Sequence, residues 1–430
     1  MPRLPGGYTT SLGLTQLVGW GTTFYIPAVL AHVMAEEAGW SLTQVFGAFS
    51  WSLLVAGIVS KSMGRAIDHR GARLVMSLGS LGIVLGLLML SIASHWLTLF
   101  AAWTVLGIAT RAAQYDSAFA AIARILGSRT RRAISIITLW GGLASTVFWP
   151  LGHLLGESIG WRWTMVVYAV LNLLICLPLH LRLPARDPIE NPEASGSEHG
   201  VTSKQLAASP ARFAASGSTP QSASSNGPTK ADAPAGPDAG AIQGDRRDRA
   251  MLVFGFVLAG YSFVFSALSA HLIVLLEGLG LASALAVGLS SIKGIAQIAA
   301  RFLEMIGQKW LGPVAVGVIA FALLAASLIM MLAMQADPVL LALATIIYGG
   351  ANGLTTIVRG AVPLALFGHA GFGTTLGKVA APGLITAAIA PLAVASLIEA
   401  SGAQLALQVL AVIALAGLAG MLWLTRRVKT

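Results

Sequence analysis

The sequence predicts an all-α integral membrane protein with twelve membrane-spanning helices in two related six-helix halves. Three observations support this fold class: a highly apolar composition, loops whose charge alternates in sign, and a polar segment that divides the chain near its middle. Of the 430 residues, 56% are hydrophobic and only 10% are charged, and the mean hydropathy is +0.78. Since a soluble domain carries roughly 25% charged residues, a water-soluble fold of this composition could not cover its surface.

The apolar residues form blocks of about the 20 residues that an α-helix needs to cross a bilayer. Lipid offers no hydrogen-bond partner to the backbone, so each block should be a helix. The predicted spans are 11–34, 43–63, 74–94, 97–126, 133–156 and 163–181, then 251–276, 282–303, 313–334, 338–367, 374–396 and 403–425. The first block is too long for a signal peptide and lacks a small-residue cleavage site, so we expect it to remain as a helix.

Basic and acidic residues segregate to alternate loops. The basic loops and C-terminal tail contain Arg65, Arg70, Arg73, Arg129, Arg131, Arg132, Arg182, Arg186, Arg301, Lys309, Arg426, Arg427 and Lys429. The acidic loops contain Glu36, Glu37, Glu157, Glu277, Asp337 and Glu399, with Arg162 as the lone basic residue. The positive-inside rule makes the basic set cytoplasmic, so both termini should lie inside a plasma (inner) membrane. The net charge of +10 is then a topology signal, and we expect no nucleic-acid partner.

Residues 183–249 separate an N-terminal half, 1–182, from a C-terminal half, 250–430. This segment is rich in Ser, Ala, Gly and Pro and nearly free of large apolar residues. Such a composition cannot bury enough surface to fold, and it predicts a disordered cytoplasmic linker.

Landmark residues recur in the two halves. Gly127, Gly142 and Pro150 match Gly368, Gly383 and Pro391 at a constant offset of 241 residues, and Ala31, His32 and Gly39 match Ala270, His271 and Gly278 at an offset of 239. Duplicated halves are typical of transporters, whose substrate site lies near the bilayer midplane between the repeats.

A charged loop between spans 43–63 and 74–94 reads Gly64-Arg-Ala-Ile-Asp68-His-Arg-Gly71-Ala-Arg73. It resembles the Gly-x-x-x-Asp-Arg-x-Gly-Arg-Arg signature of the major facilitator superfamily, which it matches at Gly64, Asp68, Gly71 and Arg73. It departs from that signature at His69 and Ala72. The resemblance implies a latch that holds the halves together on the cytoplasmic side. Asp68 would face either the cations Arg129, Arg131 and Arg132 or the positive N-terminus of span 374–396.

Two further segments are similar to motifs of this family. Arg111-Ala-Ala-Gln114-Tyr115-Asp116 resembles its Arg-x-x-Gln-Gly motif, and the segment containing Gly142, Pro150 and Gly152 partly resembles its antiporter motif. Trp149-Pro150 replaces the usual Gly-Pro pair, so antiport stays open. The chain is identified as a member of the superfamily, a bacterial secondary transporter, with two six-helix bundles as its fold.

Ionisable residues inside the predicted spans are costly in lipid and are functional candidates by default. Arg111 and Lys293 lie mid-span in different halves, where two cations lining one cavity would attract an anion. Tyr25, Gln297 and Asn352 are further candidates for substrate binding, as are Trp20, Tyr261 and Tyr348, although each fits a helix-packing role as well.

Other charges in the spans have two interpretations each. Asp116 lies more than a turn beyond Arg111 and is either half of a structural ion pair or a proton-coupling group in a network with Arg111. Arg359 and Lys378 lie near the cytoplasmic ends of their spans, where snorkelling to the interface competes with a role in the pathway. His32 and His271 are expected at the outer interface.

The predicted function is alternating-access transport of a small organic anion such as a monocarboxylate, with proton coupling as an option. The alternative is an efflux antiporter for a toxic compound, either a drug or an arsenite-type metalloid. The single cysteine, Cys176, excludes a Cys-rich metal site, and we expect no metal and no cofactor. No catalytic cluster or selectivity filter argues for an enzyme or a channel. The expected partners are a small-molecule substrate and the lipid bilayer, with the protein as a monomer.

Overall fold

The structure is a computed structural model that describes residues 5–184, 242, 244–333 and 337–428. Every regular element of these residues is helical, which confirms the all-α prediction. Most of the predicted linker, 183–249, lies outside the described residues. The last part of the predicted linker is helical, since α10 starts at Asp245. Asp245 and Asp248 lie in its first turn, where the helix dipole favours negative charge.

The N-terminal half is built from long helices, several of which are interrupted. Its elements are α1 (Pro5–Gly21), α2 (Ile26–Ala38), α3 (Leu42–Arg70), α4 (Ala72–Ser91), α5 (Trp96–Ala113), α6 (Tyr115–Leu126), a 3₁₀ turn (Gly127–Arg129), α7 (Thr130–Gly142), α8 (Ala144–Leu171), a π-helical turn (Asn172–Cys176) and α9 (Leu177–Leu181). The breaks after Gly21, Ala113 and Gly142 fall inside predicted spans, so these spans are bent rather than straight.

The C-terminal half consists of α10 (Asp245–Gly278), α11 (Ser283–Gly307), α12 (Pro313–Ala333), α13 (Pro338–Phe367) and α14 (Phe372–Val428). Helix α14 is non-helical at Gly402, where φ is +81°, and α8 is non-helical at Gly160, where φ is +76°. A positive φ is readily adopted only by glycine. Each glycine therefore supplies the sharp turn that the sequence predicts between two consecutive spans.

Nine helical segments of the described chain are long and apolar enough to cross a membrane. Two of them, 130–181 and 372–426, are 52 and 55 residues long and pass through the turns at Gly160 and Gly402. Each is long enough for two crossings. The architecture is that of a multi-pass membrane protein, while the count of twelve spans stays a prediction.

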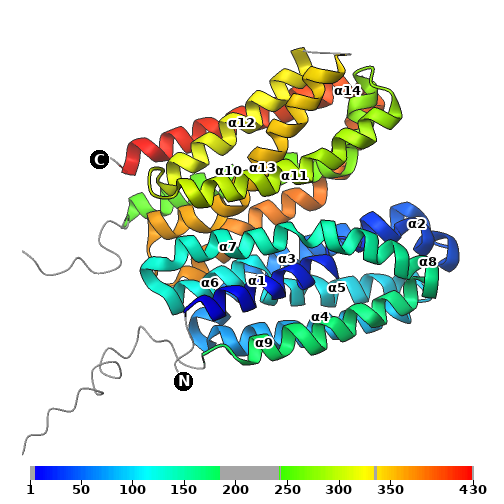
Figure 1. Cartoon of the computed structure of the whole chain (residues 1–430), viewed down its shortest axis with the longest axis horizontal. Coiled ribbons are helices and arrows are strands. Elements are labelled where there is room, and N and C mark those ends of the chain that lie inside the picture. The colour runs from blue at the N-terminus through cyan, green and yellow to red at the C-terminus, as the bar shows by residue number, and fades with distance from the viewer. Residues whose placement is uncertain (1–4, 185–241, 243, 334–336, 429–430) are drawn as a thin grey trace, which may run out of the picture.

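The two halves lie side by side, with α3 packed on α14 and α7 packed on α11. Figure 1 shows that α1 begins and α14 ends at the same end of the molecule. By the charge pattern of the loops, this end is the predicted cytoplasmic side.

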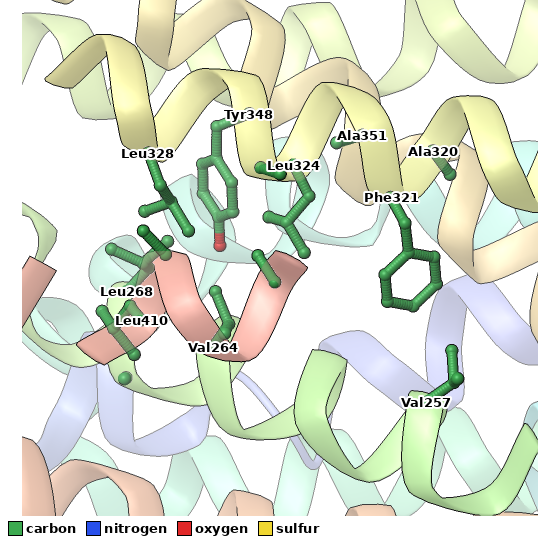
Figure 2. Packing of buried hydrophobic residues seen from close by; sticks show 14 of the residues in the cluster. Val257, Val264, Leu268, Ala320, Phe321, Leu324, Leu328, Tyr348, Ala351 and Leu410 are labelled. Carbon is green, nitrogen blue, oxygen red and sulfur yellow. The ribbon is translucent and has the colours of Figure 1, made fainter. Parts of the chain in front are cut away.

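Each half has its own apolar core. In the C-terminal half, Phe321, Leu324 and Leu328 of α12 pack against α10 and α14. The Tyr348 ring of α13 lies between Leu324 and Leu328 (Figure 2). A separate cluster joins the halves near the terminal end, where Phe119 of α6 packs with Ile357 of α13. Because this cluster draws on both halves, it ties them together at that end.

Candidate functional site

Polar contacts between the halves gather at the end where α1 begins and α14 ends. Asp68, at the end of α3, accepts hydrogen bonds from the backbone N–H groups of Gly373 (2.9 Å) and Thr374 (2.6 Å) and from the Thr374 hydroxyl (2.5 Å). The two backbone donors belong to the first turn of α14, where N–H groups have no partner within the helix and the helix dipole is positive. Of the two partners expected for Asp68, the structure has the helix N-terminus.

The other residues of the signature loop lie around this contact. A Cβ atom added at Gly64 would collide with the carbonyl group of Gly373, so only glycine lets the two backbones approach. Gly71 has φ +82° and ends α3, while Arg73 is exposed. Sequence reasoning missed Arg124 of α6, which donates to the carbonyl oxygens of Ile67 and Asp68 (2.7 Å each).

A second carboxylate, which belongs to the C-terminal half, joins the halves at the same end of the molecule. Glu304 of α11 is 5% exposed and accepts from the Ser135 hydroxyl (2.8 Å) and from Arg131 (3.1 Å) of α7. Gln308 donates to Glu304 and to Ser135. Sequence reasoning missed this contact. The available signal was Ala300-x-x-x-Glu304-x-x-Gly307-x-Lys309, which repeats the pattern of the signature loop with conservative replacements.

A buried ion triad lies deeper between the halves. Asp116 of α6 pairs with Arg111 of α5 and with Arg359 of α13. The extended backbone of Gln114 (φ −88°, ψ −165°) separates α5 from α6 and brings Asp116 back onto Arg111. Arg111 also donates to the Ser60 hydroxyl (2.9 Å). Arg359 does not snorkel away but holds a carboxylate of the other half, and its side chain keeps 25% exposure.

Arg301 requires a correction. Its place among basic residues suggested a cytoplasmic loop, yet it lies inside α11 and is 2% exposed. Its guanidinium donates to the Thr138 carbonyl of α7 (2.8 Å), to the Thr356 hydroxyl (3.1 Å) and to the Gly353 carbonyl (3.4 Å). No carboxylate lies within 4 Å of it in the described part of the chain. Arg301 falls within the predicted span 282–303, near its end, and it was grouped with the loop cations by its charge alone; α11 in fact continues to Gly307 and encloses it.

The predicted motif in span 133–156 has a direct link to Arg301. A Cβ added at Gly142 would collide with the Arg301 guanidinium, so Gly142 leaves the space through which that group reaches Thr138. Pro150 lies exposed inside α8. Gly152 packs on the Tyr168 hydroxyl, which a Cβ would approach to 2.6 Å.

The remaining predicted substrate residues are spread over the interior. Tyr25 precedes α2 at its N-cap position, is partly exposed and packs against the Trp149 ring. Asn352 accepts a hydrogen bond from the Tyr261 hydroxyl. Gln297 is partly exposed, and its carbonyl closely faces Gly353.

Lys293 places its ammonium 5.8 Å from the centre of the Tyr348 ring. Arg111 is already engaged by Asp116, and no ion pair links Lys293 to Asp116 among the described residues. Within the described ranges no group of three or more His, Cys, Asp or Glu side chains could hold a metal ion.

This chain is similar in sequence to one protein family and in fold to solved transporter structures. The family model of the Major Facilitator Superfamily matches residues 12–324. The human organic anion transporter MFSD10 (TETRAN) superimposes with a TM-score of 0.68 at 16% identity, covering 97% of this chain and 100% of that chain. The proton:xylose symporter XylE, bound to 6-bromo-6-deoxy-D-glucose, gives a TM-score of 0.71 at 12% identity, covering 99% and 96%. No curated protein matches the chain. At these identities the solved structures show the fold alone.

Proposed function

The chain belongs to the major facilitator superfamily, and from this premise we propose that it carries a small organic anion, such as a monocarboxylate, by alternating access. The fold is that of secondary transporters of small solutes. One observation carries the choice of an anion: Arg301 is a buried guanidinium with no carboxylate partner in the described chain. A buried charge without a counter-ion costs several kcal/mol, and an anionic substrate would supply that counter-ion.

The charge balance of the interior supports the same substrate class. Four cations, Arg111, Lys293, Arg301 and Arg359, accompany one carboxylate, Asp116, so this group has a formal charge of +3. Glu304 does not reduce it, because Arg131 already pairs with Glu304. A cationic interior with apolar walls attracts anions.

The roles of the four cations differ. Arg111 is enclosed by Asp116 and Ser60 and orients the carboxylate. Arg301 and the partly exposed Arg359 are the anchors for a substrate anion, because a guanidinium can bind a carboxylate through two hydrogen bonds. Lys293 adds a mobile point charge. MFSD10, a structural neighbour, is an organic anion transporter, a substrate class that suits this arrangement.

The contacts between the halves suggest how transport proceeds. The latches at Asp68 and Glu304 close the end that we assign to the cytoplasm, so an anion would enter from the opposite side. Asp116 bridges to the other half through Arg359. Protonation of Asp116 would weaken this bridge, which makes Asp116 the candidate for proton coupling. We assign the protein to the plasma (inner) membrane with both termini cytoplasmic.

The alternative of metalloid efflux gains no support from this site. An uncharged metalloid acid would leave Arg301 without a counter-ion, and the one cysteine, Cys176, is buried against the Thr15 carbonyl (3.8 Å). The same assay separates the two functions when arsenite is included.

The test is counterflow of radiolabelled monocarboxylates into proteoliposomes, because a carrier saturates and exchanges. We expect Arg301→Gln to abolish saturable exchange. Lys309→Gln is the control, because it removes an exposed cation eight residues after Arg301. This variant should retain saturable exchange. Equal exchange in wild type and Arg301→Gln, or saturable exchange of arsenite alone, would contradict the proposal.

A further inference from the structure

Five aromatic side chains of the N-terminal half form a continuous series of ring contacts near Arg301. Ring centres of Trp20 and Phe24 are 5.1 Å apart, those of Trp20 and Tyr115 are 5.0 Å apart, and those of Phe24 and Tyr25 are 5.5 Å apart. Tyr25 continues to Trp149 at 6.2 Å. We name these five residues the aromatic wall.

The aromatic wall and Arg301 are neighbours although they belong to different halves. A Cβ added at Gly141 would collide with the Tyr115 hydroxyl, and one added at the adjacent Gly142 would collide with the Arg301 guanidinium. Arg301 reaches the N-terminal half through the space left by Gly142, and Tyr115 packs against the adjacent Gly141. A ligand that contacts the guanidinium therefore has aromatic rings within reach.

Part of this wall is not sealed into a core. Trp20, Phe24 and Tyr25 are partly exposed, whereas Phe119, which stacks on Tyr115 of the same wall, is 0% exposed. Packing encloses Phe119 completely, but it leaves part of each of the other three residues uncovered.

The wall also holds an unused hydrogen-bond donor. The indole Nε1 atoms of Trp20, Trp103 and Trp161 are buried and have no acceptor among the described residues, and of these three residues only Trp20 is partly exposed. A buried N–H without a partner is costly, and an acceptor on a bound ligand would satisfy it.

We propose that the substrate is an amphiphilic organic anion with an aromatic ring. Its acid group pairs with Arg301 of the C-terminal half, and its ring packs on Trp20, Phe24 and Tyr25 of the N-terminal half. The inference rests on the proposed function and narrows its substrate class from small monocarboxylates in general to ring-bearing ones. One ligand in contact with both halves would also link its binding to their relative position.

The experiment compares three probes by calorimetric titration of the purified full chain: benzoate, acetate and benzamide. Benzoate and acetate share the carboxylate, whereas benzamide keeps the ring and loses the charge. We expect benzoate to bind about tenfold more tightly than acetate, because the ring adds buried apolar area and ring contacts. Benzamide should bind at least as weakly as acetate.

Substitutions then locate the ring. Trp20→Leu and Tyr25→Leu should each weaken benzoate binding severalfold and leave acetate binding within twofold of wild type. Trp163→Leu is the matched control, since Trp163 is 62% exposed on α8, and should change neither. Size exclusion and the melting temperature of each unliganded variant verify its fold.

The outcomes distinguish a failure of the aromatic contact from a failure of the anion site. If benzoate and acetate bind within twofold of each other, the aromatic inference is overturned and the proposed anion site stands. If benzamide binds as tightly as benzoate, the anion site itself fails. Absence of benzoate binding up to about 10 mM, the range of weak ligand affinities, overturns the inference as well.

Discussion

Asp68 and Glu304 join the two halves at the same end of the molecule with different kinds of partners. Asp68 takes backbone N–H groups and one hydroxyl of α14, whereas Glu304 takes the side chains of Ser135 and Arg131 on α7. The residue four positions earlier explains the difference. Gly64 brings α3 against the Gly373 carbonyl, while Ala300 carries a methyl group and its helix relies on the longer Glu side chain.

This difference predicts which substitutions the Asp68 contact and the Glu304 contact should each tolerate. A carboxylate held by backbone groups depends on close helix approach and little on the partner's side chains. A carboxylate held by side chains depends on those side chains and less on backbone proximity.

The largest effect is expected for Gly64→Ala. The added Cβ meets backbone atoms of Gly373, which cannot rotate away, so α3 and α14 must separate at a cost of about 1–3 kcal/mol. We expect transport to fall more than tenfold. The reporter is Ile357→Cys in a Cys176→Ser background, because Ile357 is buried where the halves meet and should become reactive to thiol reagents.

Gly47→Ala is the control for this variant. Gly47 lies on the same helix with its nearest neighbouring atom 3.9 Å from an added Cβ. It should preserve both transport and protection of the reporter. An unreactive reporter in active Gly64→Ala would show that the helices need not approach so closely.

Asp68→Asn is expected to have the next largest effect. The amide keeps one acceptor oxygen, but its NH₂ group would face N–H donors of Gly373 or Thr374 and leave a donor unsatisfied. We expect roughly a tenfold loss of transport, with the cysteine reporter at position 357 more reactive than in wild type. Unchanged reactivity would remove this contact from the closing mechanism.

Glu304→Gln should have a smaller effect than Asp68→Asn. Ser135 can still donate to the amide oxygen, and Arg131, whose side chain is 20% exposed, can recover solvation at the membrane surface. Transport should fall about threefold. The comparison breaks down if Glu304→Gln is as damaging as Asp68→Asn in the same proteoliposome assay.

The smallest effects are expected from single partners. Ser135→Ala removes one of the Glu304 hydrogen bonds, worth about 0.5–1.5 kcal/mol. Thr374→Val leaves both backbone donors to Asp68 in place and should cost less. Melting temperatures and uptake rates of the two variants test this order. A greater loss in Thr374→Val would contradict the distinction between backbone and side-chain latches.

Much of the fold could be predicted because membrane burial leaves a strong pattern in the sequence. Apolar blocks gave the helices, and glycines at positions such as Gly160 and Gly402 coincide with the turns between predicted spans. The charge pattern predicts which loops share a side of the membrane, but it does not predict where an individual cation lies. It placed Arg301 with the loops, because a cation near the end of a span has the same sequence signature whether it faces solvent or the other half.

The site was harder to predict because it depends on contacts between distant segments. The break at Gln114, which brings Asp116 onto Arg111, has no strong local signal. The partnership of Asp116 with Arg359 spans 243 positions, and no spacing rule connects them. The link between Gly142 and Arg301 likewise exists only once α7 and α11 are packed together.

The central claim is that Arg301 binds the substrate anion. The most direct measurement is a crystal structure with 4-bromobenzoate, in which anomalous scattering locates the bromine. We expect carboxylate oxygens at about 3 Å from the Arg301 guanidinium, with the bromine on the side of Trp20 and Tyr25. A ligand bound elsewhere, with Arg301 still donating only to Thr138, Gly353 and Thr356, would contradict it.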